Sequence, residues 1–382
     1  MMDTHILIDI HPSSKQDQPH DVRLQTKLPA QLASGFKGLN IEDVTKRIPL
    51  IFSICGAAQG YCAVDAAEHL LQKNNPERSQ ARSLIVLAEQ AKEYILRNLM
   101  EWAELGSDQA ALKSFAPVTQ WRKQFANATF AQTAPFHLDA LLHFNSEKVK
   151  QEIEAVETYL HKHVFNQPTE EWVKMTTCED FFQWMERSKT IPAQLVKLLL
   201  RKKTATLGQT QISPLNGVAS DVIYHKIFDD TDFPNKPKLD QKTAETGALA
   251  RQINHPLITA LAQEFGNGVL TRYVARLIEL AHIPSRMRKQ ERLCQTTQIS
   301  NDSAISTLET ARGRLYHALC LEGEAVTDYQ ILSPSQWNFH PSSIAVESLQ
   351  KLAYTDEQTI KKQAEMIIRA IDPCVGFEVR VH

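Results

Sequence analysis

A long amphipathic segment is the feature that most constrains how this chain can fold. Between Arg82 and Leu105, apolar side chains recur at steps of three and four residues, which places them on one face of a helix. Pro76 lies upstream and Gly106 downstream, where start and stop signals of a helix are expected. The segment therefore predicts a long helix within a helical core.

The remaining patterns are also mostly helical, and they predict a mainly α fold with a small β part. Further helices are predicted over 41–72 with a break near Cys55 and Gly56, and over Ser146–His163, Cys178–Arg187, Ala193–Lys203, Gln252–Phe265, Leu270–Ala281, Ser303–Leu308, Ser343–Tyr354 and Asp356–Ile371. Strands are predicted at Ile6–Ile10, Leu315–Leu321 and Thr327–Ser333. The polar, proline-containing stretch at about 204–243 predicts an irregular connection, and residues 1–382 are predicted to form a single domain.

Composition excludes several classes of protein. The formal net charge of the 382 residues is -2, so there is no broad basic surface for nucleic acid. The start of the chain does not resemble a signal peptide, and no apolar run reaches the ~18 residues of a membrane span. Six scattered cysteines do not form a disulfide framework. We therefore expect a cytoplasmic protein with no nucleic-acid or membrane partner.

Two short cysteine-containing segments lie at opposite ends of the chain. Residues 53–62 read SICGAAQGYC, and residues 371–377 read IDPCVGF. Together they resemble the paired Cys-x-x-Cys motifs of NiFe-hydrogenase large subunits, RICGVC early and DPCxxC late. Cys55 and Cys374 match the first cysteine of each pair. Ala58 and Phe377 stand where each second cysteine would be.

Neighbouring segments recur in the order of the same family. Residues 4–10 are similar to GHLRIEV, with Asp9 at the glutamate, and residues 246–251 resemble VGPLAR. Residues 309–317, ETARGRLYH, are similar to EAPRGxLxH, and 329–338 to YQxxxPTTWN. The resemblance implies a large-subunit-like fold over nearly the whole chain, although 110–240 contains no motif that matches.

The departures from this family concern metal ligands. The resemblance implies that each second cysteine bridges nickel and iron, and neither alanine nor phenylalanine offers a donor atom. A magnesium-binding glutamate is replaced by Asn40, and Arg380 takes the place of the family's late histidine, with His382 two residues further on. The tail that family enzymes carry past that histidine is expected to be absent. These differences predict a protein that binds no nickel and is not an enzyme.

Other features of the family's iron pocket are kept. The resemblance implies that Arg312 and Ser335 lie where the enzymes surround the cyanide ligands of iron. Guanidinium N–H groups and a hydroxyl can both donate hydrogen bonds to a cyanide nitrogen. Arg312 could instead pair with a carboxylate such as Glu309. Asp9 could be an ordinary edge-strand carboxylate, and His317 is expected to be structural and bonded to the backbone.

An incomplete cysteine set in a large-subunit-like chain resembles the HupK/HoxV type of hydrogenase accessory protein. That resemblance implies a scaffold or chaperone that transiently holds or delivers the Fe(CN)2CO unit, with HypC/HypD-type maturation proteins and the apo large subunit as partners. Cys55 and Cys374 would be the metal ligands, with Cys62 as a third candidate. Cys62 can join them only if a helix begins after Cys55 and the loop folds back.

Three other hypotheses remain open at this point. The chain could be a metal-free mimic of the large subunit that docks maturation factors. It could be a thiol redox switch in which Cys55 and Cys374 form a disulfide. Least favoured is an active hydrogenase with an unusual site. The carrier and switch hypotheses both require the two sulfurs to lie within about 4–6 Å of each other.

Overall fold

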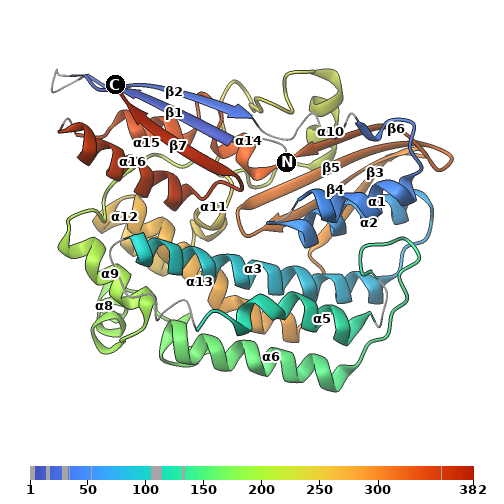
Figure 1. Cartoon of the computed structure of the whole chain (residues 1–382), viewed down its shortest axis with the longest axis horizontal. Coiled ribbons are helices and arrows are strands. Elements are labelled where there is room, and N and C mark those ends of the chain that lie inside the picture. The colour runs from blue at the N-terminus through green and yellow to red at the C-terminus, as the bar shows by residue number, and fades with distance from the viewer. Residues whose placement is uncertain are drawn as a thin grey trace.

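The computed structural model of the chain describes residues 5–13, 18–27, 33, 35–52, 54–104, 114–130, 134–353 and 355–382, with only the backbone of 99–104. Thr4, Ser53, Leu105, Gly106 and Tyr354, which belong to predicted elements or motifs, lie outside the described residues. The described chain is mostly helical with two small sheets, which confirms the predicted fold class. Figure 1 shows the long helices on one side of the molecule and the sheets on the other. That the whole chain is a single domain stays a prediction.

Four helices form the helical layer and pack on one another. They are α3 (Pro76–Glu104), α5 (Trp121–Thr129), α6 (Ser146–Leu160) and α13 (Val269–Arg288). The predicted helix beginning at Arg82 is α3, which starts earlier because a proline is well suited to the first turn. The helix predicted over Ser146–His163 ends as an α-helix at Leu160 and continues as a short π-helix, His161–Phe165.

Shorter helices flank this layer. They are a 3-10 turn (Pro117–Gln120), α7 (Thr169–Trp172), α8 (Cys178–Arg187), α9 (Ile191–Arg201), α11 (Ala248–Gln252) and α12 (Pro256–Phe265). The bounds of α8 are those predicted. The predicted helix Gln252–Phe265 is divided between α11 and α12, because the residue before Pro256 is disfavoured in a helix.

A three-stranded sheet joins the two ends of the described chain. Its strand order is β2 (Asp21–Lys27), β1 (His5–His11) and β7 (Gly376–Val381). β1 pairs antiparallel with β2 and parallel with β7, so Ile8 lies opposite Leu24 on one side and Val379 on the other. The isoleucines of β1 alternate as predicted and are fully buried. Helices α15 (Ile344–Gln350) and α16 (Glu357–Ile371) pack against this sheet.

A four-stranded antiparallel sheet lies beside it in the order β3 (Cys294–Ser300), β4 (Ser303–Thr310), β5 (Gly313–Glu322) and β6 (Ala325–Leu332). The two predicted strands correspond to β5 and β6. The predicted helix Ser303–Leu308 is wrong, because this segment is β4. β4 contacts α2 (Gly56–Leu70) on one face and α10 (Ser220–Asp229) on the other, so it is buried on both faces and loses the alternation that identifies a strand.

The polar stretch at 204–243 is not wholly irregular. It contains α10, whose Ile223 and Ile227 are buried in a second apolar cluster with Leu215 and Phe233. This cluster covers the outer face of the four-stranded sheet. The prolines correctly indicate interruptions, but a short helix between them still forms because one of its faces is buried.

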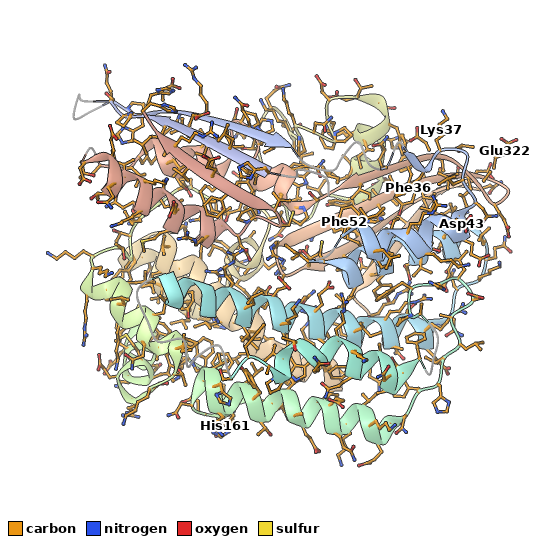
Figure 2. All side chains as sticks on the ribbon, viewed as in Figure 1. Phe36, Lys37, Asp43, Phe52, His161 and Glu322 are labelled. Atoms are coloured by element: carbon orange, nitrogen blue, oxygen red, sulfur yellow. The ribbon has the colours of Figure 1, made fainter. Side chains whose placement is uncertain are left out.

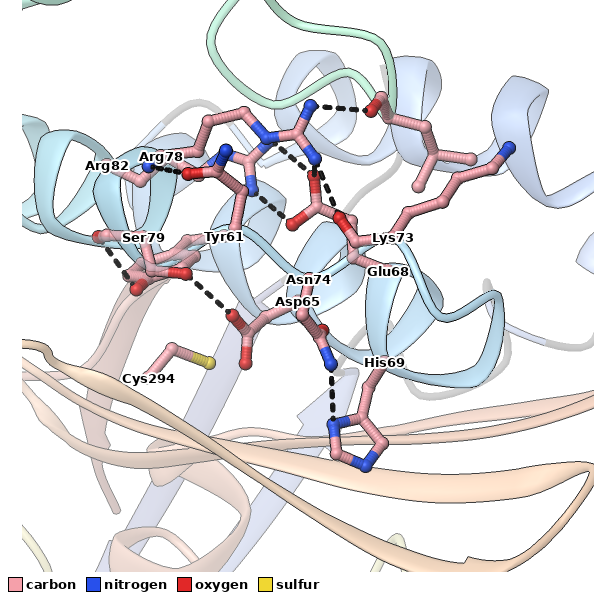
Figure 3. Close-up of polar contacts among 12 residues, drawn as sticks. Tyr61, Asp65, Glu68, His69, Lys73, Asn74, Arg78, Ser79, Arg82 and Cys294 are labelled. Carbon is pink, nitrogen blue, oxygen red and sulfur yellow. Dashed lines mark hydrogen bonds and ion pairs between the residues drawn. The ribbon is translucent and has the colours of Figure 1, made fainter. Parts of the chain in front are cut away.

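Helices α1 (Ile41–Ile51) and α2 are separated by a break, as predicted. A buried ion pair fixes α2 against α3: Arg82 donates two hydrogen bonds to the Glu68 carboxylate at 2.8 and 3.0 Å (Figure 3). Tyr61 also donates to the Ser79 carbonyl at 2.8 Å. These contacts hold α2, the helix that begins directly after Cys55.

Packing around the sheet side can be followed in Figure 2. Phe36 packs edge-on against Tyr329 of β6, with ring centres 5.5 Å apart. Phe52 directly follows α1, on the way to Cys55. None of the helices in the described part of the chain is both long enough and apolar enough to cross a membrane.

Candidate metal-binding site

Cys55 lies at the start of α2, directly before Gly56. A glycine is required there because a Cβ at Gly56 would lie 2.7 Å from the Pro49 carbonyl oxygen of α1. The close approach of α1 sets the direction in which the chain enters α2. Cys55 and Cys374 are both free cysteines at partly buried positions.

A buried carboxylate lies at the same end of α2. Glu89 of α3 accepts hydrogen bonds from the amides of Ala57 at 2.8 Å and Ala58 at 3.1 Å. Arg122 approaches the same carboxylate at 3.5 Å. Burial raises the pKa of Glu89, while the two amides and Arg122 oppose this shift. Two of the N–H groups that begin α2 are therefore satisfied from within the protein.

Cys374 follows α16 and is held by a neighbouring hydroxyl. Its amide donates to the Ser335 oxygen at 3.2 Å, and its sulfur lies 2.9 Å from the same oxygen. Ser335 is buried in α14 (Pro334–Asn338). Asp372, which ends α16 in the left-handed conformation, and Pro373 are buried as expected, whereas Cys374 is only partly buried and Gly376, Glu378 and Arg380 of β7 are exposed.

Arg312 connects these segments. Its Nε donates to the Pro373 carbonyl at 3.2 Å, and its Nη2 donates to Glu93 of α3 at 3.1 Å. Nε also lies 3.4 Å from the Asp372 carboxylate. The alternative partner Glu309 pairs with Arg251 and Arg314 instead. Arg312, in the turn between β4 and β5, therefore points towards the segment that contains Cys374.

Mutual electrostatic effects join the two cysteines and Arg312 in one group. Burial raises the pKa of Cys55, the charges of Cys374 and Glu89 raise it further, and Arg312 opposes the shift. Burial also raises the pKa of Cys374, while Ser335 and Arg312 lower it. Both residues are thus neutral thiols near pH 7. The separation of the two sulfurs stays a prediction.

A chain of hydrogen bonds reaches Cys55 from the core and was not predicted. Tyr329 bonds His317 Nδ1 at 2.6 Å, His317 Nε2 bonds Gln59 Oε1 at 2.7 Å, and Gln59 Nε2 lies 3.7 Å from the Cys55 sulfur. Burial lowers the pKa of His317 to about 3, so the ring is neutral. The side chain of His317 bonds other side chains, which corrects the expectation of a backbone partner.

Cys62 lies elsewhere on α2. It is fully buried, and its sulfur lies 4.0 Å from that of Cys294 on β3. The helix begins directly after Cys55, and seven residues of helix span about 10 Å. Within the described residues, Cys62 has no hydrogen bond to Cys55, Cys374 or Arg312. The structure therefore does not bring the third candidate ligand to this group.

The positions at which the chain departs from the family's motifs have other partners. Asn40 caps α1 by accepting from the Glu42 amide at 2.9 Å. Asp9 lies 3.0 Å from His382 Nε2, and Arg380 pairs with Glu378. No group of three or more His, Cys, Asp or Glu side chains in the described residues is arranged to bind a metal. Any metal at the Cys55–Cys374 group would thus have at most two protein ligands of these kinds.

The chain is similar to proteins described as hydrogenase expression/formation proteins. It is 26% identical over 371 residues to HupV of Azotobacter chroococcum mcd 1, and the alignment covers 94% of both chains. It is 25% identical to HupK of Azotobacter vinelandii, also over 94% of each chain. HoxV of Cupriavidus necator is 24% identical over 87% of this chain and 85% of its own length. No protein-family model matches the chain.

Solved hydrogenase structures share the fold. The NiFeSe hydrogenase of Desulfovibrio vulgaris Hildenborough in the reduced state matches with a TM-score of 0.63 at 17% identity, over 94% of each chain. An NAD+-reducing NiFe-hydrogenase in the H2-reduced state matches with a TM-score of 0.62 at 14% identity, over 94% of this chain and 93% of the other. At this identity the likeness shows the fold alone, and it confirms the large-subunit-like architecture.

Proposed function

We propose that this chain, an accessory protein of the HupK/HoxV type with a NiFe-hydrogenase large-subunit-like fold, is a maturation scaffold for the Fe(CN)2CO unit. Its relatives are described as hydrogenase expression/formation proteins, which supports a role in hydrogenase maturation. One observation carries the finer proposal: Cys374, more than 300 positions away in the sequence, and Arg312 both lie close enough to Cys55 to shift its pKa. The iron unit is cargo and not a resident cofactor.

The donor atoms around this group suit such cargo. Two thiolates are soft ligands for iron. Nη1 of Arg312 has no partner among the described residues, so its two N–H groups are available to a cyanide nitrogen. The Ser335 hydroxyl can donate to the Cys374 sulfur, and this bond strengthens when that sulfur is a thiolate. Ser335 would therefore orient a ligand in addition to lining the pocket.

The raised thiol pKa values favour transient binding. Each thiol must lose a proton to bind iron and regains it on release. Because burial stabilises the neutral thiols, it also reduces the free energy of iron binding. A final site with four cysteines then draws the cargo away. Ala58 and Phe377 carry no donor atom, so we propose that the chain binds no nickel and catalyses no hydrogenase reaction.

We further propose that delivery takes place in the cytoplasm, with HypC/HypD-type maturation proteins as donors and the apo large subunit as acceptor. The large-subunit-like fold supports this proposal, because a carrier shaped like the final recipient can present the same surfaces to the donor. The iron unit would then pass between two similar sites, from the one with fewer thiolates to the one with more.

Infrared spectroscopy of anaerobically purified protein tests the proposal. Protein from cells with the maturation machinery should show cyanide and carbonyl stretching bands, with iron but no nickel. Cys55→Ala and Cys374→Ala should each abolish the bands and block maturation of the hydrogenase. Cys178→Ala, in α8 and outside the group, is the matched control. Cys62→Ala should retain the bands, given its place beside Cys294.

Each rival hypothesis has a distinct outcome in the same preparation. Protein without iron that still supports maturation after Cys55→Ala would be a metal-free docking mimic. A Cys55–Cys374 disulfide, detected by mass spectrometry without reductant and lost with it, would indicate a redox switch. Equal losses from Cys55→Ala, Cys374→Ala and Cys178→Ala would indicate general destabilisation.

A further inference from the structure

A groove lies on the surface where three helices meet, away from the cysteine group. Its volume is about 580 Å³, and its walls come from α9, α13 and α16. Leu195, Leu199 and Val269 form buried parts of its lining, with Met366 half-buried. Figure 1 shows α9 and α16 on the same side of the molecule. This volume is in the range of sites that bind ligands.

The rim of the groove carries exposed positive charge. Lys202 caps the end of α9 and Lys362 lies on α16, so two different walls each contribute an ammonium group. Neither lysine has an ion-pair partner among the described residues. Arg369 and Glu365, which both line the groove, pair with each other at 3.4 Å and offset each other's charge. The rim is therefore cationic, although the chain as a whole has a formal charge of -2.

We propose that this groove binds an amphipathic helix of a partner protein, with an apolar stripe flanked on both sides by Asp or Glu. The apolar lining accommodates the stripe, and the lysines on two walls face the acidic flanks. A small amphiphile with one acidic head can neutralise only one of the two ammonium groups. A helix with carboxylates on both flanks can neutralise both, so the charge pattern favours the helix.

Helix α16 connects the groove to the segment that contains Cys374. Ala370 lines the groove, α16 ends at Ile371, and Cys374 follows three residues later. The Arg369 carbonyl also accepts a hydrogen bond from Arg276 of α13 at 3.4 Å. A helix bound against α16 would thus press on the element that leads directly to Cys374. Binding itself does not depend on the iron cargo, so this inference can fail while the proposed function holds.

Fluorescence anisotropy with a labelled peptide tests the proposal on the full chain. The probe is a 14-residue helical peptide with leucines at i, i+4, i+7 and i+11 and glutamates beside them. It should bind saturably, and Lys202→Glu with Lys362→Glu should weaken binding about tenfold, since two rim attractions become repulsions. The control is Lys203→Glu with Lys361→Glu, which makes the same charge change at exposed neighbouring positions outside the groove. It should change binding less than twofold.

A peptide of reversed charge provides a second test. A peptide with lysines in place of the glutamates should not bind the natural protein and should bind the Lys202→Glu, Lys362→Glu variant. Equal weakening by both double variants would overturn the proposal, because a general charge effect would then explain binding. Absence of saturable binding by the acidic peptide would also overturn it. Binding of dodecanoate but of no peptide would assign the groove to a small amphiphile.

Discussion

The buried ring of His317 should make the stability of this protein depend on pH. Its folded-state pKa is about 3, because burial opposes the charged form, and its unfolded value is about 6.5. Between these values the unfolded chain binds a proton that the folded chain does not. Stability therefore falls as the pH drops from 6.5 towards 3 and levels off below that.

The size of this effect follows from the two pKa values. At pH 5 the unfolded histidine is almost fully protonated and the folded one is almost fully neutral. The linkage relation then gives a loss of about 2 kcal/mol between pH 7 and pH 5 from this one group. The ring is fully buried, so solvent screening does not reduce this figure. It is a large fraction of the stability of an ordinary domain.

Urea unfolding at pH 7 and pH 5 measures the effect as a difference between variants. The natural chain should lose about 2 kcal/mol more than His317→Gln over this interval. His225→Gln, at an exposed position of α10, controls for the loss of a histidine as such. Comparing variants cancels other titrating groups, among them Glu89, whose pKa is raised by burial.

The same pH dependence in the natural chain and His317→Gln would refute this reasoning. If His317→Gln does not fold, ring nitrogen chemical shifts of the natural protein decide instead. They should report a neutral ring at pH 5, protonated on Nε2, because that tautomer donates to Gln59 while Nδ1 accepts from Tyr329. A ring that titrates above pH 5 would show that burial does not control it.

Three further predictions concern the same part of the fold. Restoring thiols with Ala58→Cys and Phe377→Cys should tighten iron retention and slow release, and normal maturation rates in this double variant would contradict the idea that missing bridges permit transfer. In urea unfolding, Gly56→Ala should lower the free energy of unfolding by about 1–3 kcal/mol, because the new Cβ would lie 2.7 Å from the Pro49 oxygen. The control Gly35→Ala, whose Cβ would have no atom within 4 Å, should change it by less than about 0.5 kcal/mol. In the same assay, Arg82→Met should lower the free energy of unfolding by about 3–5 kcal/mol, because it leaves the buried Glu68 carboxylate without its main partner. The control Arg286→Met, at the more exposed pair with Glu291, should lower it by less than about 1 kcal/mol.

Local patterns predicted the helices of this fold better than its strands. Cys178–Arg187 has the predicted bounds because a cap at Thr177 and a strong apolar face act within ten residues. β4 and β7 depend on partners far away in the sequence: β4 is covered on both faces, and β7 pairs with β1. Such pairing is a tertiary property. β4 shows no alternating pattern, whereas Phe377, Val379 and Val381 do alternate with Glu378 and Arg380, and this pattern was not recognised as a strand.

The sequence also identified only some of the residues of the candidate site. Cys55, Cys374, Arg312 and Ser335 could be named from the sequence because they stand in recognisable motifs. In the structure Ser335 bonds Cys374, and Cys374 and Arg312 shift the pKa of Cys55. The Glu89 carboxylate at the start of α2 and the chain from Tyr329 through His317 to Gln59 could not. Each joins residues from separate elements, and only the folded arrangement of α2, α3 and the four-stranded sheet selects them as partners.

The parallel pairing of β1 with β7 has a consequence for how the protein is made. β1 leaves the ribosome long before its partner β7, so one edge of β1 stays unpaired until β7 has been made. An open strand edge can pair with other chains, and the nascent protein would benefit from a chaperone that covers it. Cys374 lies just before β7, so the group that contains Cys55 cannot be complete until this late segment has been made. Translation therefore sets the earliest moment at which iron could be loaded.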